Sequence, residues 1–393
     1  MSPAAAAPLR ILLVSHYYPP HMGGIENVVQ QEARHLAAAG VRVTVLTSGD
    51  RSSVTVEDGV VIVRSAAWNG LERRAGIPFP IFGPGLIRQA LRWARWADVV
   101  HIHDGFYLSS WTALAAAAAL RKPVVAHQHV ALVHHGSAAV GLVQKAVYAT
   151  AGRLLMRRAR FVFTMNAGVA EFARGLGADA GRMRHLPNGV DVEAFRPVAD
   201  AAERAAERAR LGLPDDVVLV LFVGRFVPKK GFDILLAAAD PAAYHLVFAG
   251  GPADALAHRA GRDCVHYLGA LAPAEVVAAY RACDVFALPS TSEGFPLTVQ
   301  EAMSAGLAVV TSDDPGYAVY DLDRDHVSLV PRDPEALRDR LREIAADPEL
   351  RGQMGTYARA YAEEHFTWPD HVAELIGRYR SALLATTSSG DRG

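Results

Sequence analysis

Short apolar runs recur along this chain and alternate with helical or loop stretches, and this alternation restricts the possible folds more than any other feature. In the first half the runs occupy residues 9–15, 41–47, 60–65, 99–103, 124–129, 161–164 and 183–186, and a second set begins at Val217. Strands that are apolar throughout and joined by helices form parallel sheets with both faces covered. The sequence therefore predicts an α/β protein with two doubly wound, Rossmann-like sheets.

The length and composition agree with two domains. A chain of 393 residues exceeds what one ordinary core accommodates, and 51% of its residues are hydrophobic. The charged, alanine-rich stretch 200–210 separates the two sets of strands. We therefore place the boundary near Pro197, so that residues 1–196 form a first domain and the second domain begins at residue 197.

Charge and cysteine content exclude several classes of protein. The net charge of −1 argues against a nucleic-acid-binding protein that relies on a broad basic surface. Cys264 and Cys283 are the only cysteines and show no zinc or redox spacing, which fits a reducing cytosol. The N-terminus lacks the features of a signal peptide, and no apolar run is long enough to cross a bilayer. We expect a cytoplasmic protein, with the inner face of the membrane as a second possible location.

Two glutamates, Glu293 and Glu301, flank seven residues at the point where a strand gives way to a helix. The run 285–289 suits a buried parallel strand, a turn follows at 290–294, and Pro296 suits the first position of a helix. Unpaired N–H groups at such a helix start bind phosphate, and carboxylates accept hydrogen bonds from neighbouring hydroxyls. The pattern therefore predicts a ligand with a pyrophosphate between a ribose and a second polyol, which is the form of a nucleotide sugar.

The segment 293–301 resembles the E-x7-E motif of the retaining nucleotide-sugar glycosyltransferases of family four. The segment 224–231 is similar to the G-R-x5-K-G element of that family, and residues 23–26 (Gly-Gly-Ile-Glu) are similar to its donor-site loop. The resemblance implies the GT-B architecture, in which two Rossmann-like domains face each other across a cleft. The stretch 317–325 departs from the glycine-rich segment that the family has there.

The C-terminal segment also resembles the family. Residues 366–368 (Phe-Thr-Trp) and the helical stretch 371–384 are similar to its C-terminal helix, which crosses back to the first domain. The resemblance therefore implies that residues from about 370 to 393 join the first domain, and that the second domain comprises residues 197–369.

The resemblance further implies roles for individual residues. The positions implied for catalysis are His129, Arg225, Lys230 and Glu293. Those implied for binding the nucleotide sugar are Gly23, Gly24, Arg225, Lys230, Leu268, Glu293, Gly294, Phe295, Pro296, Leu297 and Glu301. In this interpretation Arg225 contacts one phosphate through two N–H groups of its planar guanidinium, and Lys230 contacts the other through its compact ammonium group. Glu301 accepts hydrogen bonds from the ribose hydroxyls.

Four histidines lie between positions 127 and 135. No Cys, Asp or Glu lies among them to complete a ligand set, so we predict no metal site. The strand 123–129 resembles the family's strand whose terminal histidine contacts the donor sugar, and alignment on Pro123 selects His129. His127 is the fallback because it points to the same face of the strand. A satisfied buried histidine is the alternative for either position.

The stretch 145–160 is expected to be a helix that carries Arg153, Arg157 and Arg160 on one face. Such a basic amphipathic helix can lie on an anionic membrane, as it does in relatives that glycosylate lipids. A solvated, arginine-lined helix is the commoner explanation, so peripheral membrane contact stays an alternative.

The resemblance covers nearly the whole chain and implies a retaining glycosyltransferase. Such an enzyme moves a hexosyl group from a UDP- or GDP-sugar to a hydroxyl of a glycan, a lipid-linked or a small-molecule acceptor. We expect no cofactor and no metal, because Arg225 and Lys230 fill the metal's role and no D-x-D element precedes the donor site. The alternatives are a same-fold nucleotide-sugar isomerase, an NAD-dependent oxidoreductase, which the absent G-x-G-x-x-G disfavours, and a catalytically silent scaffold.

Overall fold

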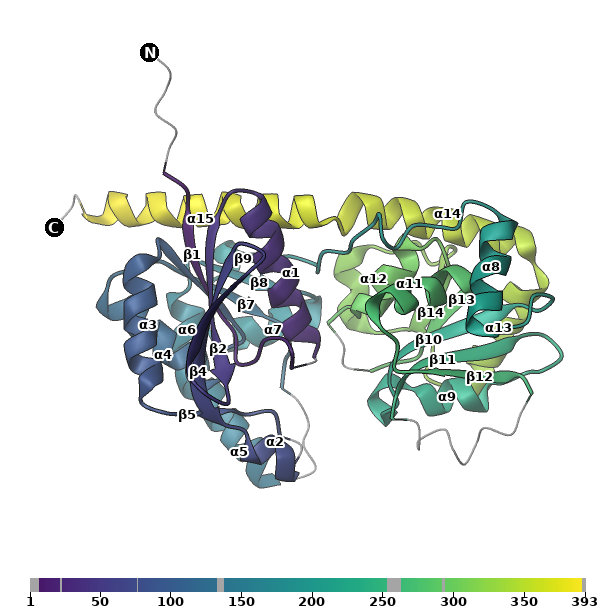
Figure 1. The fold of residues 1–393 in the computed structure, drawn as a ribbon, viewed down its shortest axis with the longest axis horizontal. Coiled ribbons are helices and arrows are strands. Elements are labelled where there is room, and N and C mark those ends of the chain that lie inside the picture. Colours follow the sequence, from purple (N-terminus) through teal and green to yellow (C-terminus); the bar gives the residue numbers. More distant parts are fainter. Residues whose placement is uncertain are drawn as a thin grey trace, which may run out of the picture. The chain divides into compact units, whose positions relative to one another are not determined.

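The computed structural model describes residues 7–21, 23–75, 77–132, 138–252, 263–291 and 294–390. It divides into two compact units (Figure 1): unit 1 comprises Met1–Gly189 and Trp368–Gly393, and unit 2 comprises Val190–Thr367. The boundary lies at Val190, compared with the predicted Pro197, and the return to unit 1 lies at Trp368, compared with about 370.

The described residues of unit 1 form one mainly parallel sheet with the strand order β3-β4-β2-β1-β6-β7-β8-β9, and β5 pairs with β4. The strands are β1 (Arg10–Val14), β2 (Arg42–Gly49), β3 (Ser53–Glu57), β4 (Val60–Trp68), β5 (Ile81–Phe82), β6 (Val99–His103), β7 (Val124–Gln128), β8 (Phe161–Thr164) and β9 (Met183–His185). Both β3 and β5 pair with β4 in the antiparallel direction. The apolar pattern does not predict these two strands, because β3 is largely exposed and β5 is two residues long.

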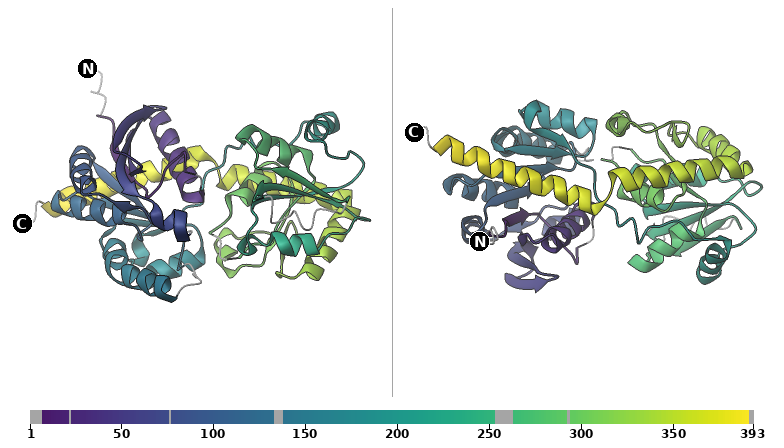
Figure 2. Two further views of the ribbon diagram at one scale, coloured as in Figure 1. Left: turned by 60° about the horizontal axis from the view of Figure 1, so that its bottom comes forward. Right: turned by 90° about the horizontal axis from the view of Figure 1, so that it is seen from above.

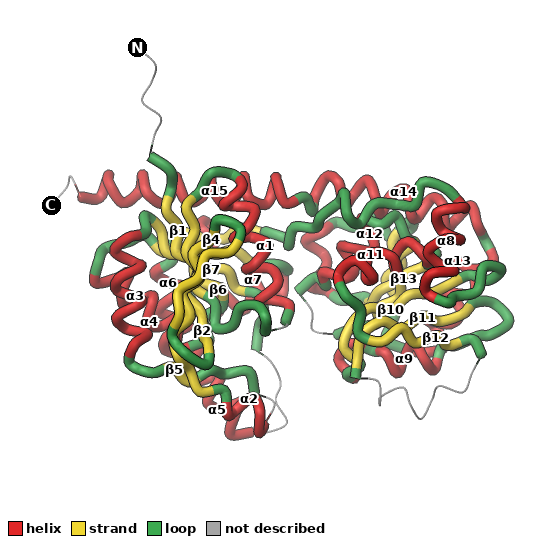
Figure 3. The backbone as a smooth tube through the Cα atoms, viewed as in Figure 1, coloured by secondary structure: helices red, strands yellow, loops and turns green. Residues whose placement is uncertain are grey.

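Helices cover both faces of the unit 1 sheet (Figure 3). The helices are α1 (Gly24–Ala38), α2 (Gly70–Ala75), α3 (Gly85–Trp96), α4 (Leu108–Ala119), α5 (Ala138–Val147), α6 (Arg153–Arg158), α7 (Ala167–Gly175) and α15 (Trp368–Gly390). Ile11 and Leu13 of β1 pack with α1 and α15, whereas Leu12 and Val14 pack with α3, α4 and α6. The strand alternation thus gives each face its own apolar core.

Two details of the helices differ from the sequence pattern. A π-helical turn, Tyr148–Gly152, separates α5 from α6, and α6 ends at Arg158. The stretch expected to be a helix over 145–160 is thus helical up to Arg158, with a π-helical turn inside it, but the placement of Arg160 on its basic face was wrong. The backbone N–H of Arg160 instead donates to Val124 O at 2.8 Å, where the chain enters β8.

The described residues of unit 2 form a parallel sheet with the order β12-β11-β10-β13-β14-β15. The strands are β10 (Leu219–Arg225), β11 (His245–Gly251), β12 (Val265–Gly269), β13 (Val285–Leu288), β14 (Ala308–Ser312) and β15 (Val327–Val330). The helices are α8 (Ala201–Leu211), α9 (Phe232–Ala237), α11 (Pro273–Ala282), α12 (Leu297–Ser304), α13 (Pro334–Ala346) and α14 (Pro348–His365). The predicted fold class, with two parallel-sheet α/β domains, is confirmed.

The strand order reverses direction once in each unit, and such switch points are where open α/β sheets bind ligands. In unit 2 the reversal lies between β10 and β13, because the chain builds outward from β10 through β11 and then from β13 through β14. In unit 1 it lies between β1 and β6. The loops after these four strands are therefore the places where the fold favours a binding site.

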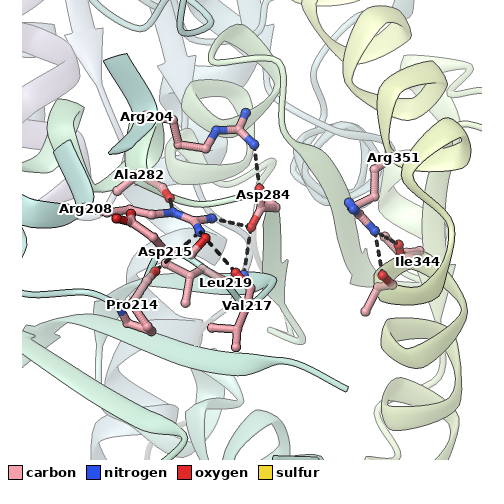
Figure 4. Close-up of polar contacts among 11 residues, drawn as sticks. Arg204, Arg208, Pro214, Asp215, Val217, Leu219, Ala282, Asp284, Ile344 and Arg351 are labelled. Atoms are coloured by element: carbon pink, nitrogen blue, oxygen red, sulfur yellow. Dashed lines mark hydrogen bonds and ion pairs between the residues drawn. The ribbon is translucent and has the colours of Figure 1, made fainter. Parts of the chain in front are cut away.

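A buried arginine fixes the two switch-point strands of unit 2 (Figure 4). Arg208 of α8 pairs with Asp284 at 2.7 Å and donates to Ala282 O at 2.8 Å, while Asp284 also accepts from the backbone N–H of Leu219 at 2.8 Å. Leu219 begins β10 and Asp284 precedes β13, so the network joins the amino ends of both strands. Burying an ion pair adds little net stability, but each member holds its partners in place.

The C-terminal helix α15 belongs to unit 1 and lies beside α1, across β6 and β7 (Figure 2). Its residues Val372, Leu375 and Tyr379 are buried in the same apolar core as α1. Neither this helix nor any other in the described part of the chain combines the length and the apolar character needed to cross a membrane.

Candidate active site

The two segments of unit 2 that the sequence selects lie next to each other in space. β10 and β13 are parallel neighbours, with Val220 opposite Val285, so the segments that follow them leave the same edge of the sheet. The backbone N–H of Thr291 donates to Lys229 O at 2.9 Å. A backbone hydrogen bond thus joins the segment 224–231 to the segment that begins at residue 290, at the switch point of the sheet.

Gly231 is required for this close approach. Its φ is +71°, a left-handed conformation, and a Cβ at this position would lie 2.1 Å from the carbonyl oxygen of Pro289. Side chains with a Cβ are disfavoured in that conformation and would also collide with the neighbouring loop. The glycine after Lys230 therefore allows the two segments to meet.

Arg332, which follows β15, clamps the same two segments. Its guanidinium donates to Pro289 O at 3.0 Å and to Pro228 O at 3.1 Å. This contact is not predicted from the sequence, because no local pattern shows that an arginine after β15 reaches the loops after β10 and β13. The clamp adds a cation beside the segment that carries Arg225 and Lys230.

Arg225 and Lys230 are placed where an anion can reach them. Arg225 is the last residue of β10 and its side chain is exposed, and Lys230 is half-buried in the turn before α9. Both residues lie at the carboxyl end of β10. The two cations can therefore contact a bound diphosphate from the same edge of the sheet.

Glu301 lies on the second turn of α12, as predicted, and its carboxylate is partly buried. The helix begins at Leu297, and Pro296 is its N-cap residue rather than its first helical residue. The Tyr280 hydroxyl lies 2.9 Å from Glu301 Oε2 and donates to it. Desolvation raises the pKa of Glu301 to about 7, although the bond from Tyr280 favours the ionised form. This carboxylate is therefore incompletely ionised at neutral pH and can gain hydrogen bonds from a ligand.

The loop before α12 is braced by aromatic packing. The Phe295 side chain is 1% exposed, stacks on Tyr320 with ring centroids 4.1 Å apart, and meets the edge of Tyr317 at 5.0 Å. The stretch 317–325 therefore supplies aromatic support where the family has glycines. With its ring in the core, Phe295 can contact a ligand through its backbone. Glu293 lies outside the described residues.

The remaining residues of unit 2 that are predicted to contact the donor lie next to Glu301 or at the edge strand β12. Gly294, Pro296 and Leu297 lie on the loop and the helix start that carry Glu301. Leu268 lies near the end of β12, at the edge of the sheet and half-buried against the apolar core. Two strand spacings separate β12 from β10, which is about 10 Å. Leu268 thus shares the carboxyl edge with Arg225 but is not adjacent to it.

The glycine pair of unit 1 lies at the other switch point, between β1 and α1. A Cβ at Gly23 would lie 2.2 Å from Glu26 Oε2, whereas a Cβ at Gly24 would meet no atom of the described residues within 4 Å. The Glu26 carboxylate folds over Gly23 and approaches His21 Nδ1 at 3.1 Å. Burial raises the pKa of Glu26. Gly23 therefore accommodates a buried acid, and Gly24 leaves its backbone open to approach.

His129 is 3% exposed and lies just beyond β7. Its Nε2 is 3.0 Å from His103 Nδ1, so one of these rings donates a hydrogen bond to the other. Burial lowers the pKa of His129 well below its ordinary value, which keeps the ring neutral. His127 faces the same side of the sheet but is fully buried. His129 is thus the one of the two that stands at the strand end, as the alignment on Pro123 predicts.

Asp104 directly follows β6, beside the switch point of unit 1, and has a φ of +66°. Its Oδ1 accepts hydrogen bonds from the Tyr148 hydroxyl and from the backbone N–H of Phe106, each at 3.0 Å. Desolvation raises the pKa of Asp104 to about 6. The sequence gives no sign of its contact with Tyr148. A perturbed, strained acid at this edge is typical of a functional residue.

Comparison with known proteins decides the family. The model "Glycosyltransferase Family 4" matches residues 22–194, and "Glycosyl transferases group 1" matches residues 203–361. The D-inositol 3-phosphate glycosyltransferase of Xylanimonas cellulosilytica is 32% identical over 387 residues and covers 92% of each chain. The chain belongs to glycosyltransferase family 4. A second D-inositol 3-phosphate glycosyltransferase, from Acidothermus cellulolyticus, is also 32% identical to this family 4 enzyme, over 92% of this chain and 86% of the other.

Solved structures show that this glycosyltransferase has the GT-B fold. Sucrose-phosphate synthase from Thermosynechococcus elongatus superposes with a TM-score of 0.73 at 23% identity, over 96% of this chain and 100% of that one. Anabaena HepE in complex with UDP gives a TM-score of 0.73 at 18% identity, over 95% and 100%. The predicted family, fold and glycosyltransferase activity are therefore confirmed.

Proposed function

We propose that this glycosyltransferase moves a hexosyl group, with retention of configuration, from a UDP- or GDP-sugar to an acceptor hydroxyl. The observation that carries the proposal is the bond from Thr291 N–H to Lys229 O, which joins the two donor-type segments of unit 2. Two cations, a helix start and a carboxylate then lie at one sheet edge. Solved complexes of the similar HepE contain UDP and UDP-glucose, which supports a uridine donor as the first to test.

In the proposed complex the diphosphate is held by Arg225 and Lys230. The first turn of α12, whose N-cap residue Pro296 makes no side-chain capping bond, adds backbone N–H groups and a positive partial charge. Glu301, when ionised, accepts hydrogen bonds from the ribose hydroxyls. Each of these groups recognises a different part of a nucleotide sugar, so together they favour this ligand over a simple anion.

The same groups would stabilise the transition state. As the bond from the sugar to the diphosphate breaks, negative charge accumulates on the leaving oxygen and the sugar gains oxocarbenium character. Preorganised donors aimed at such a charge are the largest single contribution in many enzymes. We assign this task to Arg225 and Lys230, and so propose a reaction in which no metal is needed at the diphosphate. The roles of His129, Gly23 and Gly24 in unit 1 stay predictions.

Two observations suggest acceptors for this enzyme: the names of its relatives and a basic, partly apolar surface of unit 1. The names of the curated relatives specify inositol 3-phosphate, a phosphorylated polyol, which makes this compound the first acceptor to test. Exposed apolar side chains stand beside basic ones on α5 and α6, where Leu154 lies between Arg153 and Arg157 and is 55% exposed. Such a surface suits an anionic membrane and would bring the enzyme to a lipid-linked acceptor.

The experiment that tests the proposal is an activity panel. The purified enzyme is incubated with UDP-, GDP- and TDP-sugars, each with and without inositol 3-phosphate, and released nucleotide is measured. We expect acceptor-dependent release from one class of donor. Rearrangement of the donor without any acceptor would favour the isomerase. Tight binding of NAD, without a response to any nucleotide sugar, would favour the oxidoreductase. Either result would overturn the proposal.

A further inference from the structure

Four histidines share the face of the unit 1 sheet that α1 and α15 cover. His101 and His103 alternate on β6, and His127 and His129 alternate along β7 and just past its end, so each pair points to one side. The two strands are parallel neighbours with His103 opposite His127. Helix α1 packs over this face and places Glu32 among the rings.

Glu32 approaches three of the histidines. Its Oε1 lies 3.2 Å from His101 Nδ1 and 3.5 Å from His103 Nε2, and its Oε2 lies 4.0 Å from His127 Nδ1. All four side chains are 0% exposed. One nitrogen from each of the three rings lies within 4.8 Å of the others. The cluster is therefore compact, fully buried and formed by three separate elements.

These separations suit a tetrahedral metal ion. With metal–ligand bonds of about 2.0–2.1 Å, neighbouring ligand atoms in a tetrahedral site lie about 3.3–3.4 Å apart. The two Oε1 contacts of Glu32 are close to that spacing, whereas His127 approaches the other carboxylate oxygen and its ring would have to move inward. His101 Nδ1 also lies 2.7 Å from the Tyr379 hydroxyl, so this nitrogen would exchange that hydrogen bond for the ion. Three imidazoles and one carboxylate are ligands that Zn²⁺ accepts, and four protein ligands are typical of a structural rather than a catalytic site.

The hydrogen bonding of the cluster is also incomplete. Among the described residues, neither ring nitrogen of His127 has a hydrogen-bond partner, and the same holds for His103 Nε2 and Glu32 Oε1. Buried polar atoms are nearly always paired, and unpaired ones point to an ion or water.

We propose that His101, His103, His127 and Glu32 bind one divalent transition-metal ion, with Zn²⁺ as the best match, in the core of unit 1. The ion would cross-link β6, β7 and α1. It would also support the attachment of α15 through Glu32, because His371 Nε2 lies 3.4 Å from Glu32 Oε2. The site is separate from the proposed donor contacts of unit 2 and does not depend on the proposed function.

The test uses the full chain carrying a tag without histidines. After dialysis, metal content is measured by inductively coupled plasma mass spectrometry, and chelator-treated protein is titrated with Co²⁺. We expect about one Zn²⁺ per chain and the intense visible bands of tetrahedral Co²⁺. Added Zn²⁺ should also raise the Tm of the stripped protein, since an ion that binds the folded state stabilises it.

His127→Gln is the decisive variant, because His127 has no hydrogen bond to lose among the described residues and the fold can be checked by circular dichroism. It should weaken Zn²⁺ affinity at least roughly tenfold and so lower the metal that the protein keeps after dialysis. His365→Gln, at a histidine whose side chain is 43% exposed, should leave metal content unchanged. A wild-type protein without metal and without Co²⁺ bands would overturn the proposal, and so would equal metal content in wild type and His127→Gln.

Discussion

Donor binding should depend on pH through Glu301. In the free enzyme desolvation raises the pKa of this carboxyl to about 7. The ionised form accepts hydrogen bonds from the ribose hydroxyls, so binding favours ionisation and becomes stronger as the pH rises through 7. With a pKa of about 7, the ionised fraction rises from roughly one tenth at pH 6 to nine tenths at pH 8, so the Kd should fall roughly tenfold.

The assay is calorimetric titration of the enzyme with an intact nucleotide sugar between pH 5.5 and 8.5. An intact sugar is preferred to a nucleoside diphosphate, because a terminal phosphate itself titrates near pH 6. At pH 7 about half a proton should be released per donor bound, which appears as a dependence of the measured enthalpy on the buffer.

Two variants isolate the carboxyl. Glu301→Gln keeps the shape but cannot ionise, so its Kd should be weak and nearly constant with pH. Tyr280→Phe removes the hydroxyl that lies 2.9 Å from Glu301 and favours the ionised form, so the midpoint should move to higher pH. The reasoning is refuted if wild type and Glu301→Gln show the same pH dependence.

Three further predictions concern other parts of the enzyme. Lys230→Ala should lose about 3 kcal/mol of transition-state stabilisation, which lowers kcat roughly a hundredfold. The neighbouring Lys229→Ala should change kcat little. Near-normal turnover of Lys230→Ala would contradict its assignment to the diphosphate. Gly231→Ala should destabilise unit 2 by more than the ~1–2 kcal/mol that a left-handed residue costs, because its Cβ would collide with Pro289. Gly24→Ala should be nearly neutral, since its Cβ would meet no atom among the described residues within 4 Å, and chemical denaturation compares the two variants. The enzyme should float with vesicles of anionic lipid, and Leu154→Glu should reduce recovery; no recovery of the wild type would end the membrane proposal.

Much of the fold follows from local patterns. Apolar runs followed by polar residues mark the strand ends, and the parallel arrangement then places Arg225 and the segment after β13 at one edge. Helix starts are less well determined, since Pro296 is compatible with both the N-cap and the first helical position. The helix expected to reach Arg160 ends at Arg158, because the backbone of Arg160 is bonded to β7.

What the sequence misses are contacts between distant segments. Arg332 follows β15 and donates hydrogen bonds to the loops after β10 and β13, and no local sequence pattern predicts these bonds. No acid lies among the histidines between 127 and 135, which is why the sequence alone predicts no metal site there. The structure brings Glu32 and His101 to His127 from other elements, and the available signal was the pair of His-x-His patterns on adjacent strands.

The central claim is that the segments 224–231 and 294–301 bind one nucleotide sugar. Hydrogen–deuterium exchange with and without the donor that the panel identifies tests it most directly. The account predicts that the donor slows exchange in both segments together, and that Glu301→Gln weakens this protection in both. Protection of one segment without the other, or of neither at a saturating donor concentration, would contradict it.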